Sequence, residues 1–370
     1  MARKSVNTQQ LLKRLAELGI KDPLSSNTLG EVYLMLSLRC NLRCKVCSWW
    51  GAKGPCRDRG FMDKYASSLT LKELKPFMED IISFSPKTIT FSGGEPLMYK
   101  KWYVLADYFK ARGVKVSLTT NGVFFLNNFD KLVNVVDEIN LSLGGPPSIL
   151  NLIRDNRPSH FNKILQGLKK ISDFKRNNRN KPLLGILYTI SDISYGYMSE
   201  LIEFLQDNRI PIDRYCFQHL MFIGPDTFKA QQRIFKNKFG ITSLDLWQGY
   251  TYLPKKIDFK KFRDEIKKVK KMANVRFSPD FRLHEIEDYY KCNRGALHYA
   301  DYCTAPWHQI DMMPNGDVYT CHDYFIGNIK NSSFKDIWNG QKAKNLRKYL
   351  LNKLFPGCKG CFYHYCDRVD

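Results

Sequence analysis

EVYLMLSLRCNLRCKVC, residues 31–47, places a short apolar run directly before three closely spaced cysteines. The run predicts a buried strand, and Cys40, Cys44 and Cys47 follow it in a loop. Three thiols cannot all pair as disulfides, because one is always left over. The stretch therefore indicates a strand that ends at a site for a metal ion or a metal cluster.

The same pattern of a strand-like run followed by an amphipathic segment continues to about residue 220. Six strands are predicted, at 31–38, 88–93, 114–122, 138–145, 183–190 and 214–222. Their alternation with helical segments favours a parallel sheet built from βα units. No Gly-x-Gly-x-x-Gly follows the first strand, so an α/β fold with a partial, TIM-like (β/α)6 barrel fits better than a dinucleotide-binding fold.

The rest of the chain divides into three further parts. Residues 1–30 predict an amphipathic helical extension, and residues 223–290 a connecting segment with one clear helix at 259–272. Residues 291–370 hold six of the eleven cysteines, and we expect a small, metal-stabilised α+β domain there. The barrel would occupy residues 31–222.

Composition narrows the setting. No apolar run is long enough for a membrane span, and no secretory signal is recognisable, so a cytoplasmic location is expected. In a reducing compartment, eleven cysteines are better explained by metal or catalysis than by disulfides. The net charge of +22 suggests an anionic partner, or else a surface decorated with lysine. No block of five like charges and no nucleic-acid motif is present, so nucleic-acid binding is not expected.

The opening cysteines have the spacing Cys-x3-Cys-x2-Cys. Three thiolates on one tight loop suit three corners of a cubane iron-sulfur cluster. A structural zinc ion is the alternative, since Cys56 is close enough in sequence to be a fourth ligand.

A second motif follows the second strand. FSGGEPLMY, residues 91–99, has two glycines that allow close backbone approach and a Glu-Pro turn that holds the loop extended. The cysteine triad after the first strand, with a Gly-Gly-Glu-Pro motif after the second, resembles the radical S-adenosylmethionine (radical SAM) enzymes.

That resemblance implies a set of roles. Cys40, Cys44 and Cys47 would hold three irons of a 4Fe-4S cluster, and S-adenosylmethionine would chelate the fourth iron. The backbone at Gly93, Gly94, Glu95 and Pro96 would accept the methionyl ammonium. Contacts to the ribose or the carboxylate are expected from Thr119, Asn121, Ser142 and Arg154. Ordinary turn and cap chemistry is the alternative for each of these polar residues.

One departure concerns the substrate. Peptide-modifying relatives often carry Ser-Leu-Asp-Gly at the end of the fourth strand, where this chain has Ser142-Leu143-Gly144-Gly145. A carboxylate is missing, so the resemblance does not carry the substrate class with it.

The C-terminal cysteines form a third group. WHQIDMMPNGDVYTCHDYFIGNI, residues 307–329, and SFKDIWNG, residues 333–340, resemble the auxiliary-cluster domains called SPASM, or twitch in their one-cluster form. We expect one auxiliary 4Fe-4S cluster held by Cys303, Cys321, Cys358 and Cys361. Cys366 is the first alternative ligand and Cys292 the next, and a zinc ribbon is the alternative site.

The expected activity is reductive cleavage of S-adenosylmethionine to a 5'-deoxyadenosyl radical, which removes a hydrogen atom from a substrate. The electron donor would be a flavodoxin or a ferredoxin. A peptide or protein substrate is preferred, with oxidation or rearrangement of a small molecule (a sugar, cofactor or lipid precursor) as the alternative. A non-catalytic, zinc-stabilised binding protein is the alternative of another class. Residues near the last two strands that could exchange a hydrogen atom or proton with substrate are Tyr188, Tyr215, Cys216 and Gln218, and none of them is singled out as catalytic.

Overall fold

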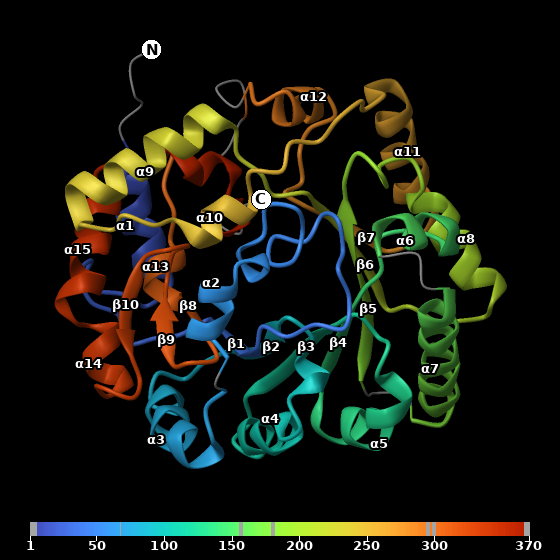
Figure 1. Ribbon diagram of the computed structural model, residues 1–370, viewed down its shortest axis with the longest axis horizontal. Helices are drawn as coiled ribbons and strands as arrows, with labels where there is room; N and C mark the ends of the chain where they lie inside the picture. The colour runs from blue at the N-terminus through green and yellow to red at the C-terminus, as the bar shows by residue number, and fades with distance from the viewer. Residues whose placement is uncertain are drawn as a thin grey trace.

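A single curved sheet organises the chain (Figure 1). The computed structural model describes residues 6–66, 68–154, 158–178, 182–293, 297 and 301–365. The ten strands lie in the order β10-β9-β8-β1-β2-β3-β4-β5-β6-β7. Strands β1 to β8 run parallel, and β9 and β10 are antiparallel. Their bounds are β1 (Glu31–Ser37), β2 (Thr88–Gly93), β3 (Lys115–Thr120), β4 (Glu138–Ser142), β5 (Leu183–Ile190), β6 (Arg214–His219), β7 (Val275–Ser278), β8 (Gln309–Met312), β9 (Asp317–Tyr319) and β10 (Phe325–Asn328).

Helices cover the outer face of the strands from β1 to β6, which confirms the predicted partial barrel (Figure 1). Helix α3 shows why the sequence folds this way: Leu74, Phe77, Met78 and Ile81 are buried at helical spacing, and a capping box between Thr70 and Glu73 starts the helix. The outer helices are α3 (Leu71–Ile82), α4 (Trp102–Lys110), α5 (Phe125–Val135), α6 (Pro147–Ile153), α7 (Pro158–Asn177) and α8 (Met198–Asp207).

The predicted connecting segment adds a strand to the sheet. Strand β7 pairs in parallel with β6, with Cys216 opposite Arg276. Its four residues are too few for a periodic pattern, so the sequence did not predict it. The predicted helix at 259–272 is confirmed, and the helices of this segment are α9 (Pro225–Phe239), α10 (Asp245–Gly249), α11 (Phe259–Met272) and α12 (Glu285–Tyr290).

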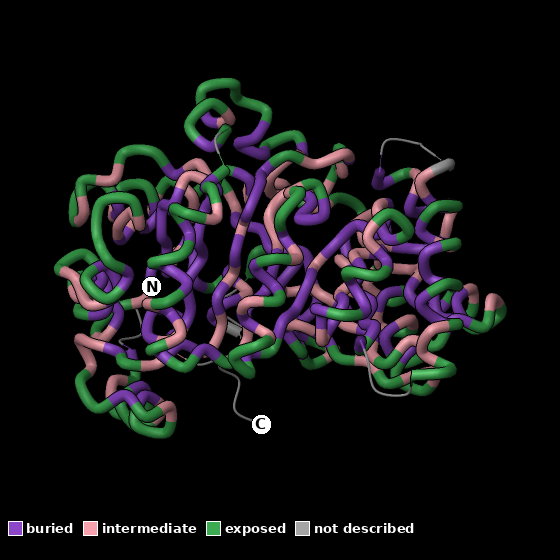
Figure 2. The backbone as a smooth tube through the Cα atoms, turned by 90° about the horizontal axis from the view of Figure 1, so that it is seen from below, coloured by how far each residue is buried: buried purple, intermediate pink, exposed green. Residues whose placement is uncertain are grey.

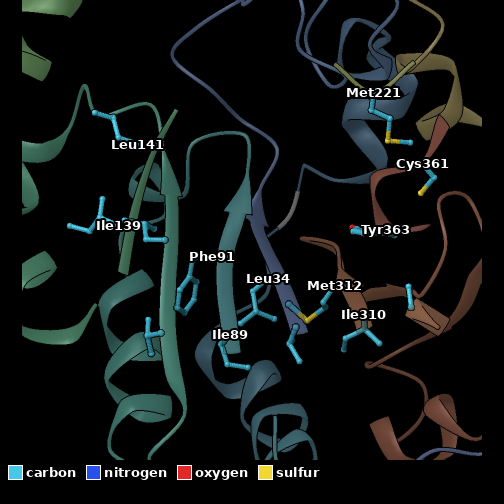
Figure 3. Packing of buried hydrophobic residues seen from close by; sticks show 14 of the residues in the cluster. Leu34, Ile89, Phe91, Ile139, Leu141, Met221, Ile310, Met312, Cys361 and Tyr363 are labelled. Carbon is cyan, nitrogen blue, oxygen red and sulfur yellow. The ribbon is translucent and has the colours of Figure 1, made fainter. Parts of the chain in front are cut away.

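The C-terminal part continues the barrel sheet. Strand β8 pairs in parallel with the free edge of β1, so that Tyr33 lies opposite Asp311 and Leu34 opposite Met312. Figure 3 shows Ile310 and Met312 next to Leu34 and Ile89 in one apolar layer. The remaining helices are α1 (Thr8–Glu17), α2 (Arg59–Lys64), α13 (Ala305–His308), α14 (Phe334–Trp338), α15 (Gln341–Leu350) and α16 (Phe362–Tyr365), with 3-10 turns η1 (Pro55–Arg57), η2 (Pro96–Met98) and η3 (Pro356–Gly360).

Polar contacts fasten the two ends of the chain together. The Trp307 indole donates to the Pro23 carbonyl (2.8 Å), and the buried Arg347 donates to the Leu24 carbonyl (3.1 Å). The N-terminal extension therefore packs on the C-terminal part.

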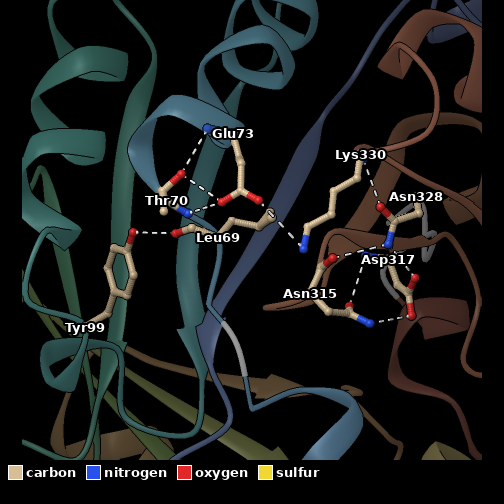
Figure 4. A network of polar contacts seen from close by, with 8 residues as sticks. All are labelled: Leu69, Thr70, Glu73, Tyr99, Asn315, Asp317, Asn328 and Lys330. Carbon is tan, nitrogen blue, oxygen red and sulfur yellow. Dashed lines mark hydrogen bonds and ion pairs between the residues drawn. The ribbon is translucent and has the colours of Figure 1, made fainter.

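A second polar network links the β9–β10 hairpin to the start of α3 through an ion pair between Lys330 and Glu73 (3.8 Å) (Figure 4).

Figure 2 shows buried backbone along the strands and exposed backbone on the surrounding turns. In β2, Ile89 and Phe91 are fully buried beneath the helices, whereas Thr88, Thr90 and Ser92 face the inside of the barrel. Closed TIM barrels fill this interior with branched apolar residues. Here the interior is polar and open, and it provides the space for a site. No helix in the described part of the chain is both long and apolar enough to cross a membrane.

The pairing of β8 with β1 predicts a stability effect. Ile310→Ala removes a fully buried side chain at this junction, so we expect the free energy of unfolding to fall by about 2–5 kcal/mol. Chemical denaturation checks this, with Leu126→Ala as a control because Leu126 is 39% exposed. Equal effects of the two substitutions would show that the junction is not a packed core.

Candidate active site

The barrel encloses a polar cavity of about 590 Å³. Cys47 and Ser48 of the triad loop line one end of it, and hydroxyl and amide side chains line the middle. These polar residues come from successive strands: Ser92, Ser117, Thr119, Asn140, Thr189 and Gln218. At the opposite end Glu138 forms ion pairs with Lys115 (2.6 Å) and Arg214. The cavity therefore runs through the barrel and opens on the triad loop.

Backbone amides surround the triad thiols. The Leu42 N–H donates to the Cys40 sulfur (3.4 Å), and the Trp50 N–H donates to the Cys47 sulfur (3.4 Å). Burial nevertheless raises the pKa of Cys40 to about 11 and also raises the pKa of Cys47. Because metal ligation needs thiolates, the positive charge of bound iron would compensate this desolvation. The loop thus fits a cluster and disfavours free thiolates.

Cys56, the fourth ligand of the zinc alternative, is also buried near the triad. Burial raises its pKa to about 12, and the nearby Cys47 thiol adds to the shift. Within the described residues, no three His, Cys, Asp or Glu side chains lie close enough to hold a single metal ion.

The Gly-Gly-Glu-Pro loop presses against the end of β1. A Cβ at Gly94 would lie 2.2 Å from the Arg39 carbonyl oxygen, and Gly93 has φ +114°, so both positions require glycine. The N–H groups of Gly94 and Glu95 donate to the carbonyls of Ser37 and Arg39 (both 2.9 Å). Since these donors are used, carbonyl oxygens are what this loop can offer to an ammonium.

The Glu95 side chain braces the loop. Its carboxylate is fully buried and accepts from the Thr120 hydroxyl (2.7 Å), the Asn121 N–H (2.9 Å) and the Leu97 N–H (3.2 Å). Burial raises the pKa of Glu95, and these donors oppose the shift. Glu95 is therefore a positioning residue whose side chain joins the β2 and β3 loops.

Two of the predicted polar residues meet at the triad. The Asn121 amide donates to Asn41 Oδ1 (2.8 Å) and approaches the Cys40 sulfur (3.9 Å). Arg154, also buried, donates to the carbonyls of Asn121 (3.2 Å) and Ser142. Burial lowers the pKa of Arg154, and the adjacent Cys44 opposes this. The guanidinium thus joins the β3 and β4 loops to the triad.

The other candidates divide. Thr119, Tyr215, Cys216 and Gln218 line the cavity. Tyr188 does not: its buried hydroxyl donates to the Ser194 carbonyl (2.6 Å). Side chains alternate between the two faces of a strand, which takes Tyr188 away from the cavity.

Four C-terminal cysteines line a separate small cavity of about 20 Å³: Cys303, Cys321, Cys358 and Cys361. Its other walls are largely apolar, with Trp247, Leu350 and Phe355 among them. Burial raises the pKa of Cys358 to about 12 and also raises that of Cys321. Four thiols in an apolar enclosure fit an iron-sulfur cluster. Cys292 is exposed and does not line this cavity, and Cys366 lies outside the described residues.

A middle cavity of about 140 Å³ lies between these two. It shares five residues with the barrel cavity: Tyr33, Ser48, Ser92, Tyr250 and Phe362. It shares Tyr363 with the cysteine-lined cavity. Asp311 and His322 also line it. No sequence motif marks either residue, because β8, which carries Asp311, meets β1 only in the folded chain, and His322 lies in the turn between β9 and β10.

The bracing role of Glu95 gives a prediction. Glu95→Gln replaces one acceptor oxygen with a donor that faces other donors, so the free energy of unfolding should fall by about 1–3 kcal/mol. Denaturation of the metal-free protein measures this. Glu79→Gln, at a side chain 56% exposed, should change it by less than about 0.5 kcal/mol. An unchanged Glu95→Gln protein would rule out the brace.

Comparisons with known proteins agree with this geometry. Residues 34–205 match the Radical SAM superfamily, and residues 303–362 match SPASM, an iron-sulfur cluster-binding domain. The Fe-coproporphyrin III synthase of Methanosarcina barkeri is 24% identical over 88% of this chain and 79% of its own. The cysteine-type anaerobic sulfatase-maturating enzyme of Clostridium novyi is 24% identical over 89% of this chain and 84% of its own.

The solved structures show the same fold. Streptococcus suis SuiB bound to the precursor peptide SuiA matches with a TM-score of 0.59 and 18% identity, over 95% of this chain and 76% of that chain. The two family matches fall on the triad barrel and on the cysteine-lined C-terminal part. They imply a 4Fe-4S cluster with S-adenosylmethionine in the first and auxiliary iron-sulfur in the second. The chain belongs to the radical SAM superfamily, as an enzyme with a C-terminal SPASM domain.

Proposed function

We propose that this enzyme oxidises a substrate held in the barrel cavity, between the two cysteine groups. The observation that carries the proposal is the series of three adjoining cavities, from the triad through the middle cavity to the four C-terminal cysteines. When bound, the cluster and S-adenosylmethionine supply one-electron chemistry that removes a hydrogen atom from an unactivated C–H bond. An auxiliary cluster held by the four C-terminal cysteines would supply an acceptor for the second electron.

The chain's own residues would bind and orient. Cys40, Cys44 and Cys47 would hold the cluster, and the loop at Gly93, Gly94, Glu95 and Pro96 would receive the methionyl ammonium. Thr119, Asn121, Ser142 and Arg154 would contact the remaining polar groups of S-adenosylmethionine. The main support is that Glu95 and Arg154 already fix these loops around the triad. Cys303, Cys321, Cys358 and Cys361 would hold one auxiliary 4Fe-4S cluster.

A peptide or protein is the substrate class we favour. Its support is the fold shared with SuiB over 95% of this chain, and the sulfatase-maturating relative. A small molecule is the second candidate, supported by the Fe-coproporphyrin III synthase relative and by a cavity of about 590 Å³, a usual volume for small ligands. A cytoplasmic setting goes with either, because free thiols and clusters suit a reducing compartment.

The electron donor we propose is a flavodoxin or a ferredoxin. A hollow beside the triad loop is lined by Arg39, Lys100 and Lys101, and by no acidic residue of the described chain. With a net charge of +22, such a surface favours an acidic protein.

Iron content and product formation test the activity. Protein purified without oxygen should hold about eight irons, and the Cys40→Ala/Cys44→Ala/Cys47→Ala protein about four. With dithionite and S-adenosylmethionine, only the unaltered triad should yield 5'-deoxyadenosine. Cys56→Ala is the matched control. It should keep iron and activity, because Cys56 is not a ligand of the proposed cluster. If Cys56 were the fourth ligand of a zinc site, the same variant would lose its metal. A protein that holds zinc instead of iron and does not cleave S-adenosylmethionine would contradict the proposal.

The auxiliary site is tested separately. Cys358→Ala/Cys361→Ala should also reduce iron to about four per chain while leaving the triad cluster able to cleave S-adenosylmethionine. Cys292→Ser should keep all of the iron, because Cys292 is exposed and outside the cavity. Electron paramagnetic resonance of the reduced proteins distinguishes the two clusters. Loss of iron in Cys292→Ser would show that Cys292 is a ligand and would contradict the proposed set of four cysteines.

A further inference from the structure

The middle cavity has walls of a particular chemistry. Aromatic rings from five parts of the chain line it, including Tyr33, Trp49, Tyr250, Tyr319 and Phe362. A single carboxylate, Asp311, is set among them, and no lysine or arginine is among the described residues that line the cavity. Aromatic faces attract cations, and a carboxylate adds the opposite charge.

Asp311 is incompletely satisfied. It is 4% exposed, and both of its oxygens accept from the same donor, the Tyr363 hydroxyl (2.9 Å each). A carboxylate offers about four acceptor positions, so others remain open. Burial raises the pKa of Asp311 to about 7, and the Tyr363 hydroxyl opposes the shift. A cation beside it would remove much of the cost of burying the charge.

His322 adds a second open acceptor. It is 5% exposed, stacks on the Tyr363 ring at 5.0 Å, and its Nε2 has no hydrogen-bond partner in the described chain. His322 lines the cavity, and the Nε2 of a neutral imidazole can accept one hydrogen bond. An ammonium group, with three N–H donors, matches a carboxylate and a neutral imidazole better than a hydroxyl does.

We propose that the middle cavity binds an aliphatic ammonium group of the substrate, with Asp311 as its counter-ion and the aromatic rings around it. The inference rests on the proposed function, because the cavity adjoins the barrel cavity where the reacting C–H bond would lie. A volume of about 140 Å³ holds a few carbons and an ammonium, about the space of five waters. The substrate class is thus an amine, either a lysine side chain of a peptide or a free primary amine.

Binding is measured without turnover. Protein loaded with iron, under anaerobic conditions, is titrated with n-butylammonium chloride by calorimetry, and n-butanol serves as the uncharged probe of equal length. We expect saturable binding of n-butylammonium and at least about tenfold weaker binding of n-butanol. Equal binding of both probes would overturn the proposal.

Variants locate the site. Asp311→Asn should weaken n-butylammonium binding about tenfold or more, whereas Asp317→Asn, a nearby carboxylate outside the cavity, should leave it unchanged. Iron content and the thermal unfolding midpoint check that each variant is folded. Unchanged binding in folded, iron-loaded Asp311→Asn would contradict the proposal.

The pH dependence needs no variant. The groups that face Asp311 are Tyr33 on β1, Tyr319 on β9, Tyr363 on α16, Tyr250 at the end of α10, and His322 in the β9–β10 turn. Burial raises the pKa values of Tyr250 and Tyr319, so neither tyrosine ionises in the range in which Asp311 does. Affinity for n-butylammonium should therefore rise as Asp311 ionises between about pH 6 and about pH 9, below the amine's own pKa of about 10. A flat profile would contradict the role of Asp311.

A third probe distinguishes the two sources. Nα-acetyl-lysine methylamide that binds at least as tightly as n-butylammonium would identify a peptidyl lysine, and weaker binding would identify a free amine. The 5'-deoxyadenosine assay is independent of these titrations. If the enzyme forms 5'-deoxyadenosine but does not bind n-butylammonium, only this inference is overturned. If the protein binds n-butylammonium but forms no 5'-deoxyadenosine, only the proposed function is overturned.

Discussion

Strand β1 pairs in parallel with β2 on one edge and with β8 on the other, and the arrangement of the site depends on this double pairing. The first pairing brings the triad loop beside the Gly-Gly-Glu-Pro loop, since both follow carboxyl ends of neighbouring strands. The second places Asp311 opposite Tyr33, with the C-terminal cysteines beyond it. Backbone hydrogen bonds therefore fix how the ends of β1 and β8 lie relative to each other.

Two buried charged side chains near the triad hold neighbouring loops together. Glu95 collects donors from the β2 and β3 loops, and Arg154 collects carbonyls from the β3 and β4 loops. Both side chains are almost without solvent contact, and their hydrogen bonds hold them in place. Asp311 differs from them because only one neutral hydroxyl serves it. Glu95 and Arg154 are each held by several groups, whereas Asp311, at the middle cavity, accepts from one hydroxyl.

Much of the site is recognisable from short motifs. Cys40, Cys44, Cys47 and the loop at Gly93–Glu95 lie within a few residues of a strand end, so local spacing and strand order suffice to bring them together. The C-terminal cysteines are further apart in the chain, but the sequence around them resembles a known domain. Four of them line one cavity: Cys303, Cys321, Cys358 and Cys361. Strand β7 was not predicted, because its four residues are too few to show a hydrophobic periodicity. The sequence predicts the strand that carries Tyr188 but not which face of that strand its side chain occupies, and the side chain points away from the cavity.

The sequence by itself determined the order of the barrel strands and helices, the family and the cysteine groups, because each depends on neighbours along the chain. Tertiary structure alone decided that β8 extends the barrel at β1, that the barrel interior is a polar cavity, and that Asp311 and His322 border a space between the cysteine groups. These features join residues almost three hundred positions apart, as Tyr33 and Asp311 are. Such pairings arise from packing and strand register, which no local pattern encodes.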